Sequence, residues 1–331
     1  METRKVQITG GSTFTVSLPK EWATRINLEM GDTLQLFPHD RTLIIEPEEG
    51  NESWDTEVDI DNLSKTQVRR TIQALYTTGF NHITLSASTD LSGNRRVISA
   101  TARNLIGLET FESTPTQITF QSLLDSTTVS VEQSTIQLRQ IALSMHEDAV
   151  TALLEQDDNL AEHIVEQDNQ VDRLYAMISR HFQRSLVSLQ ETEELELDQS
   201  ELYDYQTTAR QLERVADHAE KIANLATQFE DLPSTDFAEE IEMKAEASRR
   251  IVEQATSTIV GEANIDTAHN ALDRRDDLTT ELQDLEQKLH NQDIPESHLI
   301  ALTLDSLTRT AEYGGNIAET ALQTAARDRC L

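Results

Sequence analysis

The sequence predicts a multidomain α+β protein with a small β-rich head, an αβαββ connecting domain and an all-α body of two three-helix bundles. Apolar and polar residues alternate near the N-terminus, whereas helical periodicity dominates from Val131 onward and glycine nearly vanishes there. A chain of 331 residues also exceeds the usual size of one domain. We expect domains at 1–47, 62–124 and 131–331, with the bundles at about 131–230 and 236–328.

The predicted head begins with alternating apolar residues, a pattern typical of half-buried strands. These residues flank a Gly10-Gly11-Ser12 turn and are Val6, Ile8, Phe14, Val16 and Leu18. Pro19 favours the start of a short helix, and strands are expected at 34–37 and 43–46, around a His39-Asp40 turn. A fragment of about 46 residues buries little surface, so we expect it to dimerise. The glycine turn lacks the Lys-Ser/Thr and the following helix of a phosphate loop.

Three segments of the head, 17–22 (Ser-Leu-Pro-Lys-Glu-Trp), 30–34 (Met-Gly-Asp-Thr-Leu) and 43–47 (Leu-Ile-Ile-Glu-Pro), resemble the swapped-hairpin AbrB/SpoVT family. The resemblance implies an interleaved homodimer that contacts DNA through basic residues. Residues 1–46 carry five basic and six acidic side chains, a balance of −1, so the other 285 residues carry −31. The candidate nucleic-acid-binding residues are Arg4, Lys5, Lys20, Arg25 and Arg41. The alternative is a dimerisation module that does not bind DNA, because five cations offer few phosphate contacts in high salt.

An acidic linker is expected at 48–61, followed by the αβαββ connecting domain. Its predicted elements are a helix at 67–78, a strand at 82–86, a helix at 95–106 and strands at 109–113 and 117–123. Thr114-Pro115 marks the turn between the last two strands. No catalytic constellation occurs here, so a scaffold or ligand-sensing role is expected.

The body shows six helical segments separated by proline-containing breaks at Leu232-Pro233 and 293–295. The first is marked by apolar residues from Leu138 to Ala152, and the others are expected at about 159–189, 202–229, 237–260, 266–289 and 298–327. An internal repeat aligns 307–319 with 212–224, and 275–281 with 168–174. Each repeat is therefore interpreted as one bundle.

Residues 212–224 resemble the signature helix of the phosphate-uptake-regulator (PhoU) family. The match runs through Leu212, Glu213, Arg214, Asp217, His218, Ile222 and Ala223, while Lys221 replaces an asparagine of the pattern. The resemblance implies a metal site formed by carboxylate pairs on two neighbouring helices, and the matching residues are Asp168, Asp172, Glu213 and Asp217. It also implies that His218 supports Asp217 from outside the ligand set. The whole chain resembles archaeal regulators that join an AbrB-like head to a PhoU-like body.

Four neighbouring carboxylates repel one another, and a bound cation or raised pKa values relieve that repulsion. Oxygen ligands favour Mg, Ca, Mn or iron over zinc, so the expected cofactor is a divalent metal or iron ion. The second repeat has Thr308, Thr279 and Arg275 at ligand positions, which predicts at most one site per chain. The alternative is a solvated acidic face without metal.

The chain carries 59 acidic and 27 basic residues, a net charge of −32. Only six of the basic residues are lysines, and this composition is typical of a halophilic proteome, in which concentrated salt screens self-repulsion. The single cysteine, Cys330, fits a reducing compartment. No apolar run approaches 18 residues and the N-terminus lacks a signal-peptide core, so we expect a soluble cytoplasmic protein.

These features predict a non-enzymatic, dimeric, DNA-binding regulator of phosphate uptake with a metal-binding bundle. The expected partners are promoter DNA, a component of a phosphate transport system and a second copy of the chain. One alternative is an adaptor that docks a transporter or sensor without contacting DNA. A carboxylate-bundle metalloenzyme is disfavoured, because ferritin-like sites use Glu-x-x-His pairs in a four-helix bundle.

Overall fold

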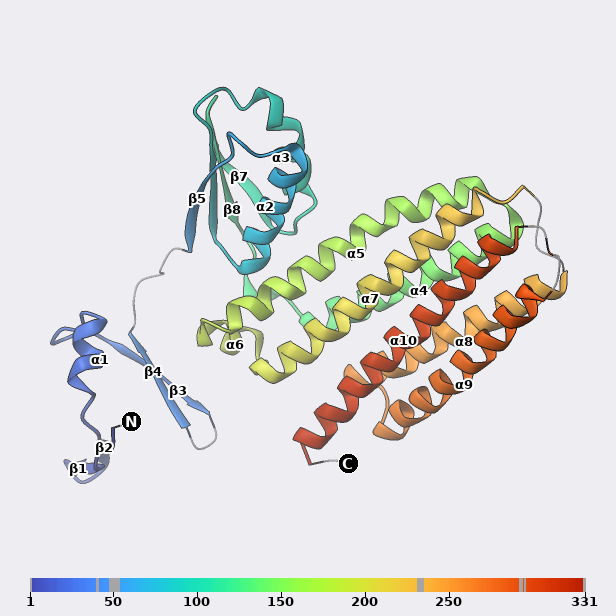
Figure 1. The fold of residues 1–331 in the computed structure, drawn as a ribbon. Coiled ribbons are helices and arrows are strands. Elements are labelled where there is room, and N and C mark those ends of the chain that lie inside the picture. The colour runs from blue at the N-terminus through green and yellow to red at the C-terminus, as the bar shows by residue number, and fades with distance from the viewer. Residues whose placement is uncertain are drawn as a thin grey trace. The chain divides into compact units, whose positions relative to one another are not determined.

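The computed structural model describes residues 2–39, 42–47, 54–230, 235–291, 294 and 296–329. The chain divides into two compact units, Met1–Ser53 and Trp54–Leu331. In the first unit, β1 (Gln7–Thr9) and β2 (Thr13–Thr15) form an antiparallel hairpin (Figure 1). Gly10 and Gly11 make its turn with φ angles of 64° and 81°, which glycine adopts without strain. Helix α1 (Lys20–Arg25) and the antiparallel pair β3 (Leu34–His39) and β4 (Thr42–Pro47) follow.

The expectation that the first strands are half-buried is wrong for a single chain. Val6, Ile8 and Phe14 are 65%, 64% and 74% exposed, and Phe37 is the one buried apolar side chain among the described residues of this unit. Within the described residues of this unit, no second layer covers the hairpin. The alternating apolar residues therefore form a face that is exposed to solvent in this unit alone.

The second unit begins with a sheet of strand order β5-β6-β8-β7, whose strands are β5 (Asp55–Asp59), β6 (His82–Ser86), β7 (Leu108–Ser113) and β8 (Gln117–Ser122). Strand β5 pairs in parallel with β6, and the other pairs are antiparallel. The predicted linker at 48–61 therefore contains an edge strand, and the domain is βαβαββ instead of αβαββ. Alternate acidic residues on the exposed side of β5 made this strand resemble a linker.

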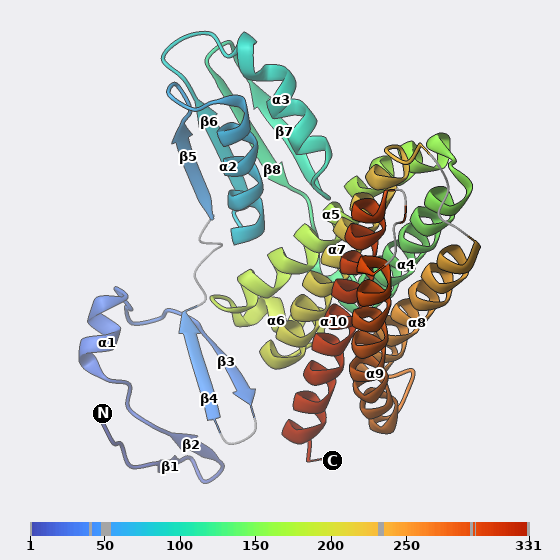
Figure 2. The same ribbon diagram turned by 45° about the vertical axis from the view of Figure 1, so that its right-hand side comes forward.

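Two helices, α2 (Lys65–Thr78) and α3 (Ser92–Arg103), pack together on one face of the sheet (Figure 2). Their apolar sides share a buried core with Ile83, Leu85 and Phe120 of the sheet. Ser64 and Gln67 form a capping box at the start of α2. Gly79 ends the helix at a φ of 112°, and a Cβ atom there would lie 2.6 Å from Cγ of Arg184.

The body contains six long helices, as predicted, and one short helix in the described residues. The first bundle is α4 (Val131–Glu155), α5 (Asp158–Ser185) and α7 (Gln199–Ala226), with the short α6 (Leu189–Leu195) between the last two. The second is α8 (Thr235–Ile259), α9 (Ile265–His290) and α10 (Ser297–Arg327). None of the described helices is long and apolar enough to cross a membrane.

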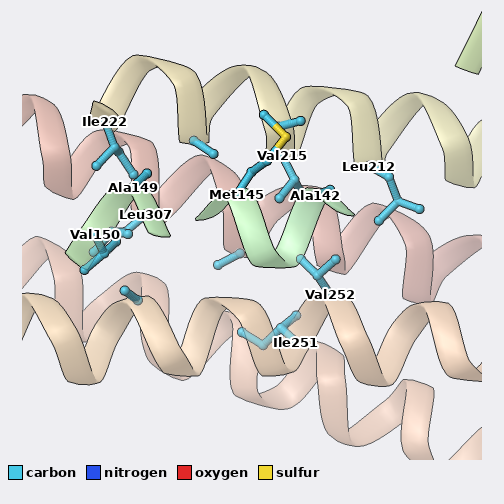
Figure 3. Close-up of a cluster of buried hydrophobic side chains, with 14 of the residues drawn as sticks. Ala142, Met145, Ala149, Val150, Leu212, Val215, Ile222, Ile251, Val252 and Leu307 are labelled. Atoms are coloured by element: carbon cyan, nitrogen blue, oxygen red, sulfur yellow. The ribbon is translucent and has the colours of Figure 1, made fainter. Parts of the chain in front are cut away.

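The two bundles share one continuous core. Helix α7 packs against α10, and α4 packs against α8. Figure 3 shows the central layer, in which Met145 of α4 lies beside Val215 of α7, and Val252 of α8 belongs to the same buried cluster. Each of these side chains is fully buried. The body is therefore a single packed unit in which each repeat covers the apolar side of the other.

A buried polar network joins the sheet domain to the first bundle. Arg184 of α5 donates hydrogen bonds to the carbonyl of Gly79 at 3.2 Å and to Asn81 Oδ1 at 2.7 Å. It also pairs with Glu191, whose side chain is 1% exposed and accepts hydrogen bonds from Ser126 and His181. Burial would raise the pKa of Glu191, but the His181 hydrogen bond and the Arg184 charge lower it to about 2. The ionised carboxylate thus holds this junction together.

Candidate functional site

The structure brings the four predicted metal ligands onto two adjacent helices. Asp168 and Asp172 lie one turn apart on α5, and Glu213 and Asp217 lie one turn apart on α7. The two helices pack through buried neighbours of these carboxylates, including Val171 on α5. The apolar stripe of each helix therefore sets its acidic pair at the edge of the shared core.

The pKa values of the four carboxylates are all raised. Burial, followed by the charges of Asp172, Glu220 and Asp217, raises the pKa of Asp168 to about 7. Burial, followed by Asp217 and Asp172, raises the pKa of Glu213 to about 7. The pKa values of Asp172 and Asp217 are also raised, in both cases chiefly by burial. The charges of Asp172 and Asp217 thus disfavour ionisation of Asp168 and Glu213.

Glu220 was not among the predicted ligands, although it lies one turn after Asp217 on α7. Its negative charge raises the pKa of both Asp168 and Asp217. The signal for it was present in the sequence, because residues three apart on a helix share a face. We therefore include Glu220 in the acidic patch, which hereafter denotes Asp168, Asp172, Glu213, Asp217 and Glu220.

The donor chemistry of the acidic patch fits a hard cation. Oδ1 of Asp168 is buried and has no hydrogen-bond partner among the described residues. Within the part of the chain that the structure describes, however, no three His, Cys, Asp or Glu side chains converge closely enough to hold one metal ion. A cation here would therefore take fewer than three ligands from these side chains as placed, and water or another ligand would complete its coordination.

The corresponding positions of the second bundle carry an internal cation. Arg275, the counterpart of Asp168, pairs with Asp276 at 2.6 Å and approaches Glu319 at 3.6 Å. Thr279 and Thr308 donate their hydroxyl groups to carbonyls of their own helices. In the second bundle, a guanidinium thus supplies positive charge between α9 and α10. The matched positions of the first bundle carry only carboxylates.

His218 lies at the contact between the two bundles. Its Nε2 atom is 3.4 Å from the hydroxyl of Tyr313, and the ring centroids are 5.6 Å apart. Its Nδ1 is buried without a hydrogen-bond partner among the described residues. Burial, followed by the charge of Lys221, lowers the pKa of His218 to about 4. The neutral ring therefore packs between the bundles, and among the described residues it makes no hydrogen bond to Asp217.

A pocket of about 490 Å³ opens beside the acidic patch, between the sheet domain and the first bundle. Asp172 and Glu213 line one side, and Arg69 and Arg70 of α2 line another. These arginines were not identified from the sequence. An adjacent basic pair in so acidic a chain was the available signal, but only the packing of α2 on α5 places it near the carboxylates.

The predicted nucleic-acid-binding residues lie on separate parts of the head. Arg4 and Lys5 precede β1, and Lys20 and Arg25 are the first and last residues of α1. All four side chains are exposed, and Arg4 pairs with Glu2. Arg41 lies outside the described residues.

Two family models match separate parts of the chain. Residues 135–226 match the PhoU domain. Residues 7–53 match the family described as antidote-toxin recognition MazE, bacterial antitoxin. The first match falls on the helices of the first bundle, and the second falls on the N-terminal unit. The comparison with curated proteins finds no match.

Two solved structures resemble the chain. The crystal structure of PhoU from Pseudomonas aeruginosa is 22% identical, with a TM-score of 0.49 and coverage of 60% of this chain and 96% of that one. The phosphate transport system regulatory protein PhoU from Streptococcus pneumoniae is 18% identical, with a TM-score of 0.46 and coverage of 58% and 91%.

Proposed function

We propose that this protein is a non-enzymatic regulator of phosphate uptake that acts as a dimer, binds promoter DNA through its head and binds a cation on its first bundle. The observation that carries the proposal is the presence in one chain of a PhoU domain at 135–226 and a MazE-type domain at 7–53. The net charge of −32 suits a cytoplasm rich in salt, where self-repulsion is screened.

The DNA contact is assigned to the head because the rest of the chain is strongly acidic. The head has a balance of −1, and Lys5, Lys20 and Arg25 make no ion pair among the described residues. A dimer presents each of these cations twice. Exposed apolar residues such as Phe14 give a second copy a surface to cover.

A salt titration of binding to a promoter fragment tests this assignment. Each phosphate contact steepens the fall of log K with log salt by about 0.9. Arg4→Glu with Lys5→Glu should weaken binding and flatten the slope. Arg250→Glu, on the exposed side of α8, is the matched charge reversal and should change neither. An unaltered slope in the head variant would place the DNA surface elsewhere.

Elemental analysis tests the cation site. Protein purified without chelator should contain a divalent metal or iron ion, and Asp168→Asn with Glu213→Gln should remove it. Thr308→Ala, at the counterpart of Glu213, should leave the metal content unchanged. Equal metal content in the wild type and the double variant would refute the assignment.

The second candidate function is an adaptor that docks a phosphate-transport component without DNA. The strong negative charge favours it, because acidic surfaces repel nucleic acid. Pull-down of the tagged protein from cells grown with and without phosphate separates the two functions. Recovery of promoter fragments supports the regulator, whereas recovery of a transport component without DNA supports the adaptor.

A further inference from the structure

The pocket beside the acidic patch is lined by both basic and acidic side chains. Its volume of about 490 Å³ falls within the range of small-molecule sites, roughly 300–1,000 Å³. Arg69 and Arg70 contribute positive charge from the sheet domain, while Asp172 and Glu213 contribute negative charge from the bundle. A complementary ligand therefore needs an anionic group toward α2 and a cationic centre toward α5 and α7.

The two arginines are available to such a ligand. Among the described residues, neither guanidinium makes an ion pair, although both line the same pocket as two carboxylates. The planar guanidinium matches the oxygens of a phosphoryl group in a two-pronged geometry. Arg69 and Arg70 can thus donate hydrogen bonds to the oxygens of a phosphoryl group on this side of the pocket.

The carboxylates suit a cation that is shared with the ligand. Proteins commonly hold Mg²⁺ through one or two carboxylates together with phosphate oxygens and water, without a cage of protein ligands. The described part of the chain has no three-ligand cluster, yet Asp172 and Glu213 both face this pocket. Two carboxylates opposite two arginines are the arrangement expected for a metal-bound phosphoryl group.

We propose that this pocket binds a phosphoryl-bearing small molecule as its Mg²⁺ complex, with the phosphoryl oxygens on Arg69 and Arg70 and the cation on Asp172 and Glu213. This inference rests on the proposed cation site and assigns it a ligand. The pocket also offers the amides of Asn104 and Asn169 and the ring of Tyr175. These groups suit the organic part of a phosphate ester, and the shared chemistry also includes free phosphate.

Isothermal titration calorimetry of the full chain in potassium chloride buffer tests the proposal. Mg²⁺ is titrated alone first, and then inorganic phosphate, AMP and ATP are each titrated with Mg²⁺ and with chelator. At least one phosphoryl compound should bind, and chelator should weaken that binding at least tenfold. Preference for inorganic phosphate or for a nucleotide identifies the source of the group.

Four variants locate the site. Arg69→Gln with Arg70→Gln should weaken phosphoryl binding at least tenfold and leave Mg²⁺ binding unchanged. Asp172→Asn with Glu213→Gln should weaken both. Arg96→Gln on α3 and Asp284→Asn on α9, both exposed and outside the pocket, should alter neither. Circular dichroism verifies that each variant is folded.

The contrary outcomes separate this inference from the proposed function. If Mg²⁺ binds but no phosphoryl compound does, the cation site stands and the ligand assignment is overturned. If neither Mg²⁺ nor any phosphoryl compound binds, the cation site and the ligand assignment are both refuted. Undiminished phosphoryl binding by the arginine variant would overturn the assignment of this pocket.

Discussion

Arg180 of α5 donates a 2.7 Å hydrogen bond to the backbone carbonyl of Tyr76, near the end of α2, and its guanidinium lies 5.1 Å from the centre of the tyrosine ring. The same guanidinium donates to the carbonyl of Phe80 at 3.0 Å and to Asn81 Oδ1 at 3.2 Å. Arg180 is 2% exposed. A buried charge thus satisfies the carbonyl groups where α2 ends, and it holds the sheet domain against the bundle that carries the acidic patch.

Replacing Arg180 should loosen this junction. Arg180→Ala removes the side-chain donor of the part-buried Phe80 carbonyl and one of the two donors of the Tyr76 carbonyl, which still accepts from the Gly79 N–H. Loss of a buried hydrogen-bond partner costs about 1–3 kcal/mol. We expect the free energy of unfolding of the sheet domain to fall by about 2–4 kcal/mol. Urea titration followed by Trp54 fluorescence in a Trp22→Phe background measures it. Exposed Arg96→Ala should stay within about 0.5 kcal/mol of the parent, and an equal effect of both changes would refute a special role for the junction.

The acidic patch should make stability depend on pH when no cation is bound. The pKa values of Asp168 and Glu213 are raised to about 7, so the folded state favours their protonated forms. This contribution is fully present below the ordinary carboxyl pKa values and is lost as pH rises through about 7. Melting temperatures in chelator should therefore fall more steeply with pH for the wild type than for Asp168→Asn with Glu213→Gln.

A divalent cation should offset this loss, because it binds the ionised carboxylates. Added Mg²⁺ should raise the melting temperature of the wild type more at about pH 8 than at about pH 5, where the carboxyl groups are mostly protonated. The double variant serves as the control for cation effects elsewhere on this acidic chain. Identical pH profiles for the two proteins in chelator would argue against the electrostatic coupling of the patch.

Two adjacent glycines on α10 should respond differently to alanine. A Cβ atom at Gly314 would lie 2.8 Å from Cγ2 of Ile251 and 2.9 Å from the backbone nitrogen of Val252. One at Gly315 would lie 2.7 Å from a terminal nitrogen of Arg275, which can rotate away. We expect Gly314→Ala to destabilise the body by about 1–3 kcal/mol, because backbone must shift.

Gly315→Ala is the matched control, since both changes gain about 0.5–1 kcal/mol of helix propensity. It should remain within about 1 kcal/mol of the wild type in urea titrations followed by circular dichroism. A smaller cost at Gly314 than at Gly315 would contradict the close approach of α10 to α8.

The exposed face of the head should mediate dimerisation. Phe14 is 74% exposed on β2, beside the similarly exposed Ile8 of β1. We expect the full chain to sediment as a dimer and Phe14→Ser to shift it toward the monomer, because the change removes apolar surface from the interface. Leu302→Ser, at a 42% exposed position of α10, is the control and should leave the dimer intact. A monomeric wild type would refute a second copy as the partner of this face.

Much of the body could be predicted because helical periodicity is local. Apolar residues three and four apart locate the six long helices, and the same spacing aligns Asp168 with Asp172 and Glu213 with Asp217. The edge strand β5 was missed because a short strand with alternate acidic residues has no long periodic signal. The short helix α6 was missed for a similar reason, because its seven residues lie almost entirely between the helices expected at 159–189 and 202–229.

The helical body, the acidic pairs and the apolar alternation of the head can be recognised in the sequence, because each depends on neighbours within a few residues along the backbone. The contacts between those elements depend on how the whole chain packs. Arg180 finds Tyr76 across 104 residues of chain, and Arg69 and Arg70 come to line a pocket with Asp172 and Glu213 because α2 packs on α5. Such contacts follow from the shape and burial of whole surfaces, which no short window of sequence contains.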